Sequence, residues 1–290
     1  MRKIKKKLSF WLSRGIDALA HRSPLLANKL RYWRLYKKWP DLKNPRTFGE
    51  KIMARMSMPE FEQLADYADK RKVREYIADT IGDEYNIPLL AVYDTPEEVR
   101  YDLIPEGAYI KLNHASNCNI VYREAQKAEI SSKLKKWYET DFSQNWLEMQ
   151  YKPISRKILV QPDLAPGGEP LYDLCFFAFN GHVEFTQIRN NRGLRISVDR
   201  DFKETPYSLN THRSEIPDKL PHYDLLVTMA DALAKPFAFV RVDFFLVGDK
   251  PYFGELTFSP GAGYRIFKPY EYNLIFGDMI PMAVFHTPEA

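Results

Sequence analysis

The stretch Phe239–Phe245 (FVRVDFF), followed by Tyr252–Gly263 (YFGELTFSPGAG), decides the fold of this 290-residue chain. Both segments are rich in β-branched and aromatic residues, which favours strands. Gly248-Asp249-Lys250 stands between them and suits a tight hairpin turn. The pattern therefore predicts two adjacent antiparallel strands, over 237–247 and 251–257.

Four polar residues interrupt this apolar hairpin at alternate positions. Arg241 shares a face with Asp243, and Thr257 shares a face with Glu255, because the side-chain period of a strand is two. Burying two carboxylates is costly unless a cation neutralises them. Two hard oxygen donors beside a hydroxyl suit Mg²⁺, which usually also holds nucleotide phosphates. The alternative is a salt bridge, such as Arg241 to Glu255, on a strand that faces water.

Outward from this hairpin, the chain consists of predicted helices followed by a largely antiparallel sheet with helices. We expect helices over 47–57, 62–79, 124–139 and 222–234, and further strands over 87–93, 108–112, 157–161, 172–179 and 182–188. Thr47, followed by Glu50, has the pattern of a capping box. Asn180-Gly181 predicts a hairpin turn between two of the strands. This order of elements indicates an α+β fold.

Composition excludes several classes of protein. With 45% hydrophobic residues, the chain has enough apolar surface for a packed core, which excludes a disordered protein. No run of about 18 apolar residues occurs, so we expect no membrane span. Cys118 and Cys175 offer neither a zinc spacing nor a disulfide framework, which favours a reducing compartment.

Positive charge is concentrated near the N-terminus. Residues 1–60 contain 16 Lys/Arg and 4 Asp/Glu, whereas the whole chain carries only +4. At helical spacing, one face collects Leu8, Trp11, Leu12, Ile16 and Leu19. Two interpretations stay open: a helix over 1–20 that lies on an anionic membrane, or a helix that packs on its own protein with a solvated basic face. No nucleic-acid recognition module matches, so no nucleic-acid partner is expected.

Two further stretches suggest a nucleotide site. Tyr109–Val121 (YIKLNHASNCNIV) places Lys111 on a strand before a loop of small polar residues, which suits phosphate, although no Walker loop is present. His114 in that loop is more typical of an exposed polar residue than of a ligand. Lys157–Leu164 (KILVQPDL) ends a strand at Gln161, where free backbone groups suit an adenine ring. The alternative is an ordinary core strand that leaves the sheet.

Taken in order, these pieces resemble the TupA-like branch of the ATP-grasp family, found with bacterial surface-polysaccharide synthesis. The matching segments are NPRTFGEKI (44–52), ADKRKVR (68–74), IG (81–82), KLNHAS (111–116), FNG (179–181), RVDF (241–244) and GELTF (254–258). The resemblance extends from about residue 40 to about residue 270. It implies an ATP-grasp fold of two α+β lobes, with a basic helical segment at 1–40, a helical region at 41–105 and the ATP-grasp domain at 106–290.

The resemblance also assigns roles to single residues. It places ATP against Lys70, Lys111, Asn113, His114, Ser116, Asn117, Gln161 and Leu164, with 113–119 as a mobile loop over the triphosphate and 158–164 as the hinge along the adenine. It makes Asp243, Glu255 and Thr257 the magnesium ligands. It also implies that Arg241 stabilises the phosphoryl group during transfer. Four positions depart from the family pattern: Gln161 replaces an acidic residue, Ala115 a glycine, Leu174 a lysine and Thr257 an asparagine.

The implied reaction is Mg-ATP-dependent carboxylate–amine ligation through an acyl phosphate. The implied partners are a uronic acid on a polysaccharide or lipid-linked glycan and an amino acid, joined by a cytoplasmic enzyme that can rest on the inner membrane face. Candidate acceptor-site residues are Tyr264, Arg265, Tyr270, His182, Arg189 and Arg192. The alternatives are a glycosyl- or phosphoryl-transferase of the same pathway, and a degenerate ATP-grasp protein that binds nucleotide without turnover.

Overall fold

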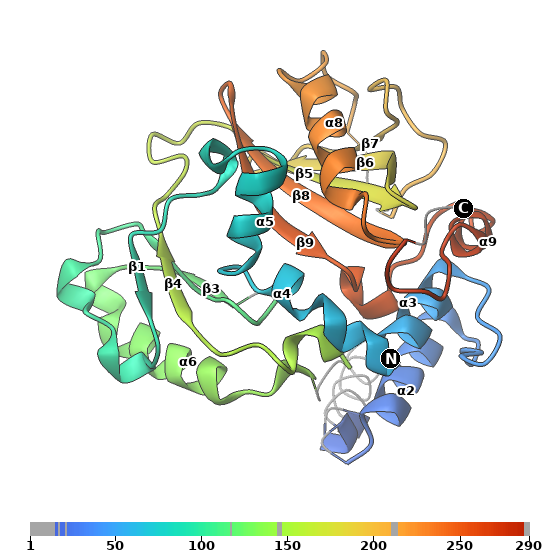
Figure 1. Cartoon of the computed structure of the whole chain (residues 1–290), viewed down its shortest axis with the longest axis horizontal. Helices are drawn as coiled ribbons and strands as arrows, with labels where there is room; N and C mark the ends of the chain where they lie inside the picture. The colour runs from blue at the N-terminus through green and yellow to red at the C-terminus, as the bar shows by residue number, and fades with distance from the viewer. Residues whose placement is uncertain are drawn as a thin grey trace, which may run out of the picture.

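Two antiparallel sheets organise the chain (Figure 1). A computed structural model describes residues 15–16, 18–20, 22–116, 118–143, 147–209 and 214–286. The strand orders are β1-β4-β2-β3 in one sheet and β7-β6-β5-β8-β9 in the other. The expectation of an α+β fold with antiparallel sheets is therefore confirmed. Within the described ranges, no helix is both long enough and apolar enough to cross a bilayer.

The elements have the following bounds. The strands are β1 (Ala91–Tyr93), β2 (Tyr109–Leu112), β3 (Asn119–Val121), β4 (Ile158–Gln161), β5 (Leu171–Phe179), β6 (His182–Asn190), β7 (Arg195–Val198), β8 (Phe239–Val247) and β9 (Lys250–Thr257). The α-helices are α2 (Pro24–Tyr36), α3 (Phe48–Met56), α4 (Ala65–Ala68), α5 (Val73–Thr80), α6 (Lys127–Glu139), α8 (Tyr223–Ala234) and α9 (Tyr272–Asp278). Short 3₁₀ helices are η1 (Pro59–Leu64), η2 (Asp83–Tyr85), η3 (Pro96–Glu98), η4 (Tyr101–Leu103), η5 (Glu124–Gln126), η6 (Met149–Tyr151) and η7 (Pro260–Gly263).

The predicted β8–β9 hairpin is present in the expected register. Asp243 pairs with Glu255 and Arg241 pairs with Thr257, so all four side chains lie on one face. Gly254 is an extra residue at a bulge beside this pair, and a Cβ there would lie 3.0 Å from the carbonyl oxygen of Asp243. Glycine therefore lets the two strands stay close at the carboxylates.

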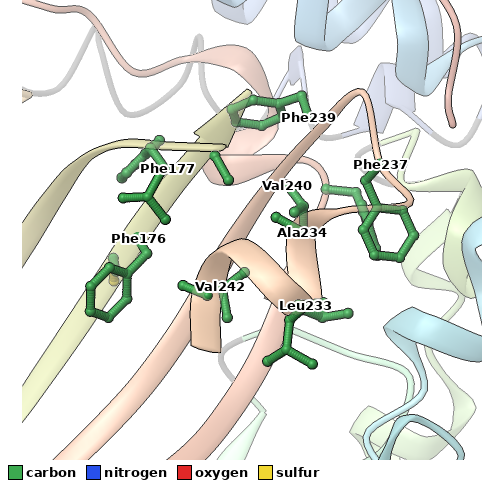
Figure 2. Packing of buried hydrophobic residues seen from close by; sticks show 14 of the residues in the cluster. Phe176, Phe177, Leu233, Ala234, Phe237, Phe239, Val240 and Val242 are labelled. Atoms are coloured by element: carbon green, nitrogen blue, oxygen red, sulfur yellow. The ribbon is translucent and has the colours of Figure 1, made fainter. Parts of the chain in front are cut away.

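The two faces of the five-stranded sheet differ in character. Val240 and Val242 alternate with Arg241 and Asp243 along β8 and point to the opposite face, where α8 packs (Figure 2). Leu233 and Ala234 of α8 are fully buried against this face. Burial of each large apolar side chain contributes about 1.5–3 kcal/mol. The α8 side thus belongs to the core. The other face of β8 is apolar at one end, where Phe239 packs on Phe48 of α3, and polar at Arg241 and Asp243.

The helix expected over 62–79 is broken, and this expectation was wrong. The segment forms η1, α4 and α5, with a turn at residues 69–72. The Asp69 side chain accepts hydrogen bonds from the backbone N–H groups of Arg71, at 2.8 Å, and Lys72, at 3.4 Å. An aspartate that bonds its neighbours in this way competes with a continuous helix. The break directs Lys70 toward β9, with its Nζ beside the Glu255 carboxylate.

Other predicted elements differ in extent. The strand expected over 87–93 is limited to Ala91–Tyr93, since Pro88 has no N–H to donate to a ladder. β3, β7 and α9 were not predicted; the first two have only three and four residues. At the N-terminus, Ile16 and Ala20 pack against Ala27 of α2, with Leu19 beside them. Leu8, Trp11 and Leu12 lie outside the described residues, so the membrane interpretation of 1–20 stays a prediction.

Helix α3 packs closely on the segment that follows β9. Its N-terminus has the predicted capping box, in which Glu50 N–H donates to Thr47 and the Glu50 side chain accepts from the Thr47 backbone. Within this first turn, Gly49 faces Gly263 of η7. A Cβ on Gly49 would lie 2.4 Å from the Gly263 carbonyl oxygen. The two glycines thus allow backbone-to-backbone contact between α3 and η7.

We predict that Gly49→Ala lowers the free energy of unfolding by about 1–3 kcal/mol, because the added methyl group must displace the backbone of η7. Urea denaturation followed by circular dichroism measures this change. Gly15→Ala is the matched control, since no described residue lies within 4 Å of a Cβ there. The control should leave stability unchanged or raise it by up to about 1 kcal/mol. Equal effects of the two substitutions would contradict the close contact.

Candidate active site

A cavity of about 910 Å³ is lined by residues of both sheets, including β2, β4, β5, β6, β8 and β9. In Figure 1 the two sheets lie on either side of α4 and α5. The charged residues that line the cavity are Lys70, Arg74, Lys111, Arg189, Arg241, Arg265, Glu148, Asp173, Asp243 and Glu255. Six of these are basic and four acidic, so the cavity favours an anionic ligand.

The centre of the cavity wall is an Arg241–Asp243 pair. Arg241 Nε donates to Asp243 Oδ1 at 2.7 Å, and its Nη2 bonds the other carboxylate oxygen. Asp243 is only 5% exposed. Burial raises the pKa of Asp243, while Arg241 acts in the opposite direction. A fork-shaped guanidinium is suited to hold a buried carboxylate in this two-point way.

Thr257 completes the same row of side chains. Its hydroxyl accepts from Arg241 Nη2 at 3.1 Å and donates to Glu255 Oε1 at 3.1 Å. Arg241 Nη2 also lies 3.7 Å from Glu255 Oε1. The salt bridge considered as an alternative to a metal site is therefore present, but it faces the cavity between the sheets.

Lys70 joins the two sheets across the cavity. Its Nζ lies 3.2 Å from Glu255 Oε2 on β9 and donates to the Ala115 carbonyl at 2.9 Å in the loop after β2. Its backbone N–H donates to the Asn113 carbonyl at 3.2 Å. Burial opposes ionisation of Glu255, but Lys70 and Arg241 outweigh it and lower the pKa of Glu255 to about 2. Glu255 is thus a carboxylate at neutral pH.

Lys111 lines the cavity without an ion pair in the part of the chain that the structure describes. Burial and the nearby charge of Lys70 lower the pKa of Lys111 to about 8. Lys111 is partly buried, with its Nζ 5.8 Å from the centroid of the Tyr109 ring. A partly desolvated ammonium without an ion pair destabilises the free protein. The same ammonium is available to an anionic ligand.

The other predicted ATP-binding residues divide into two groups. Ser116 and Gln161 line the cavity, and Gln161 Oε1 is buried without a hydrogen-bond partner among the described residues. Asn113 and His114 are buried outside the lining. Asn113 accepts from the Lys157 backbone N–H at 2.7 Å and donates to the Ser155 carbonyl at 2.9 Å, so it fixes the loop.

His114 packs near the rings of Tyr138 and Phe142, and burial lowers its pKa to about 4. The prediction of an exposed polar loop residue was therefore wrong for His114. Leu164 lies beyond the end of β4 and is not part of the lining. Asn117 lies outside the described residues. β4 is a central strand between β1 and β2, so its backbone N–H and C=O groups bond to strands on both sides. The backbone groups that suit an adenine ring are therefore those after Gln161.

One departure from the family pattern has a structural reason. Leu174 is fully buried in the main core and pairs with Phe244 on the side of the sheet away from Asp243. A lysine there would place a charge in the core. The side chains of β5 that line the cavity side are those of Asp173 and Cys175, which pair with Phe245 and Asp243.

Three of the candidate acceptor-site residues, Tyr264, Arg265 and Arg189, line the cavity; His182, Arg192 and Tyr270 are not in its lining. Arg189 Nε donates to Asp173 Oδ2 at 2.7 Å. Sequence reasoning missed Glu148. The only available signal was a single glutamate before the irregular segment QYKPIS (150–155), which has no strand or helix period.

Comparison with known proteins assigns the family. The family model described as TupA-like ATPgrasp matches residues 50–281, about four fifths of the chain. The chain belongs to this family. Its two antiparallel sheets around a charged cavity constitute the ATP-grasp fold that the sequence predicted. No curated protein matches the sequence.

Solved ATP-grasp structures are distant relatives. D-alanine–D-alanine ligase of Helicobacter pylori is 16% identical, with a TM-score of 0.45, and the match covers 74% of this chain and 61% of that one. The Bacillus anthracis enzyme complexed with ATP is 15% identical, with a TM-score of 0.41 and coverages of 74% and 63%. Macrocyclase MdnC of Microcystis aeruginosa, bound with precursor peptide MdnA, is 14% identical, with a TM-score of 0.38 and coverages of 75% and 62%. The chain spans about three fifths of the length of these proteins.

The donor set of this TupA-like protein fits Mg²⁺ held together with a nucleotide. Asp243 and Glu255 provide two neighbouring carboxylates, and Thr257 a hydroxyl. In the described ranges, no group of three or more His, Cys, Asp or Glu is placed to hold a metal ion, and this set contains only two carboxylates. Because Mg²⁺ is usually bound by one or two carboxylates plus phosphates and water, this small set is sufficient.

We predict that Lys111→Met stabilises the ligand-free protein at pH 7 by about 1–3 kcal/mol, because one pKa unit corresponds to about 1.4 kcal/mol. The folded pKa of about 8 lies below the ordinary 10.5, so wild-type stability should rise with pH between these values. The variant should lack this rise. Thermal unfolding from pH 7 to pH 10 measures both effects.

Lys136→Met, at an exposed position of α6, is the control for that experiment and should change stability by no more than about 0.5 kcal/mol. A loss of stability in Lys111→Met at pH 7 would contradict an unpaired ammonium at this site.

Proposed function

We propose that this protein is a Mg-ATP-dependent carboxylate–amine ligase of bacterial surface-polysaccharide biosynthesis. The observation that carries the proposal is the pairing of Asp243 with Glu255 on neighbouring strands, in a cavity that also contains Lys70, Lys111 and Arg241. Two carboxylates surrounded by three cations suit a nucleotide whose phosphates are bound partly through a metal ion and partly by lysines.

In this proposal the nucleotide lies between the two sheets. Lys70 and Lys111 neutralise phosphate oxygens, and Ser116 belongs to the loop that covers them. Gln161 and the backbone after β4 contact the adenine. The unpartnered Gln161 Oε1 supports this placement, since a buried acceptor without a donor is costly and an adenine amino group would satisfy it.

A carboxylate cannot expel its own oxygen at neutral pH, so it must be activated before an amine can react with it. Transfer of the γ-phosphoryl group to a carboxylate oxygen gives an acyl phosphate, from which an amine displaces phosphate to form an amide. Bound magnesium neutralises phosphate charge and orients the phosphates. Arg241 stabilises the charge on the phosphoryl group during transfer, and Asp243 and Thr257 orient its guanidinium. No covalent enzyme intermediate is needed.

The proposed carboxylate is a uronic acid of a polysaccharide or lipid-linked glycan, and the proposed amine is an amino acid. Arg265, which has no ion pair in the described ranges, and Arg189 lie in the cavity wall and suit a carboxylate. Tyr264 offers an aromatic ring to a sugar face. The basic N-terminal segment suits a position beside anionic lipid.

We predict that Asp243→Asn abolishes Mg²⁺-dependent ATP turnover, with a loss of at least about 100-fold, because an amide cannot supply the anionic oxygens that metal and Arg241 require. ADP release measures turnover. A thermal-shift scan with ATP, GTP and UDP-sugars, with and without Mg²⁺, measures binding. Asp249→Asn, at an exposed position of the β8–β9 turn and outside the cavity lining, is the control.

The same scan separates the alternatives. A Mg²⁺-dependent shift with ATP that is lost in Asp243→Asn supports the ligase. A shift with UDP-sugars alone would replace the ligase by a glycosyltransferase. Tight ATP binding without ADP release in the presence of uronates and amino acids would indicate a non-catalytic binding protein. Retained turnover in Asp243→Asn would remove the metal assignment.

A further inference from the structure

Glu148 is a buried carboxylate in the cavity wall that the proposed nucleotide chemistry does not use. It is 7% exposed and lines the cavity just before η6. Ser259, two residues after Thr257, donates its hydroxyl hydrogen to Glu148 Oε1 at 2.9 Å. Gln150 Nε2 donates to the Ser259 oxygen at 3.0 Å. The sequence around 148 and the segment after β9 are thus joined at the wall of the cavity.

Glu148 differs from the other three carboxylates in this cavity. Asp173 is paired with Arg189, Asp243 with Arg241, and Glu255 with Lys70. Glu148 makes no ion pair with any residue of the described ranges; it accepts a hydrogen bond from the neutral hydroxyl of Ser259. A buried carboxylate is normally paired with a cation. The missing partner is therefore a group that the described residues do not provide.

The surroundings of Glu148 point to a cation that arrives with a ligand. Burial raises the pKa of Glu148 to about 7; the Ser259 hydrogen bond and Lys70 oppose this rise, and Glu255 adds to it. A carboxylate in this range is able to accept a proton at neutral pH and to release it again. Because Glu148 lies in the same cavity as Glu255 and Arg241, a cation bound to it is next to the proposed phosphoryl-transfer site.

We propose that Glu148, oriented by Ser259, is the subsite that binds the ammonium group of the amine substrate and accepts its proton before amide formation. This inference rests on the proposed function and identifies a residue that the nucleotide and metal assignments leave without a role. Ser259 is a positioning residue, since it acts through Glu148.

The step balances as follows. The ammonium R–NH₃⁺ transfers one proton to the Glu148 carboxylate and becomes R–NH₂. The nitrogen lone pair forms the N–C bond to the acyl carbon, and the C–O bond to phosphate breaks. That electron pair leaves with the phosphate, which takes the second N–H proton. The products are the amide, hydrogen phosphate and protonated Glu148, which returns its proton to solvent when the products leave.

The test compares two nucleophiles in the full-length protein. Hydroxylamine is largely unprotonated at neutral pH, so it traps an acyl phosphate without needing a base. Wild type and Glu148→Gln are given ATP, Mg²⁺ and D-glucuronate or D-galacturonate, with hydroxylamine in one series and each of the twenty standard amino acids in the other. Hydroxamate and amide are quantified separately.

We expect Glu148→Gln to keep hydroxamate formation within about threefold of wild type and to lose amide formation at least about 100-fold, a size typical of a lost general base. Glu148→Gln should also melt at the same temperature as wild type or higher, because it removes an unpaired buried charge. Ser259→Ala should lower amide formation and spare hydroxamate. Glu139→Gln, an exposed change in α6, should alter neither product.

Each other outcome decides a separate question. Equal amide formation by wild type and Glu148→Gln would overturn the subsite and leave the ligase proposal intact. Loss of both products in a folded Glu148→Gln would place Glu148 in carboxylate activation, which also overturns it. Hydroxamate without amide from any amino acid in wild type would exclude amino acids and this role for Glu148. Absence of hydroxamate in wild type would defeat the proposed function first.

Discussion

The Arg241 guanidinium and the Asp243 carboxylate hold each other where neither charge is stable alone. Their two-point contact lies on the polar face of a sheet whose opposite face is packed with Val240, Val242 and the residues of α8. Strand alternation fixes this arrangement, because a shift of one residue would place both charges in the core. Burial of the apolar side chains on one face of β8 therefore fixes the register of the strand, and with it the positions of the charged side chains on the other face.

The turn at residues 69–72, between α4 and α5, connects the charged side chains of β8 and β9 to the four-stranded sheet. Lys70 reaches Glu255 on one side and the Ala115 carbonyl on the other, while its backbone bonds Asn113. The contacts of a single side chain thus set the relation between β9 and the loop after β2. A continuous helix over this segment would have kept Lys70 on a regular helical face and left the relation unspecified.

The sequence was most informative where one periodicity dominates. The hairpin, the pairing of Asp243 with Glu255 and the capping box at Thr47 depend on local rules, and each was predicted correctly. The burial of His114 depends on Tyr138 and Phe142, which are distant in the sequence, so no local pattern indicated it. The break at Asp69 is local, but the helical spacing of apolar residues over 62–79 does not reveal that its side chain bonds the Arg71 and Lys72 N–H groups. Glu148 lies in an irregular segment, where burial and the absence of a cation become visible only in three dimensions.

Lys111 is partly buried and Glu148 is buried, and neither forms an ion pair with a described residue. In our proposals, Lys111 binds an anionic ligand and Glu148 a cationic one. Ligands that supply these partners bind the folded chain and not the unfolded one, so they add to its stability by mass action. In a growing cell, the ligand-free molecules are therefore the ones most open to unfolding and proteolysis. On the proposed function, the lifetime of this protein is thus coupled to the supply of its substrates.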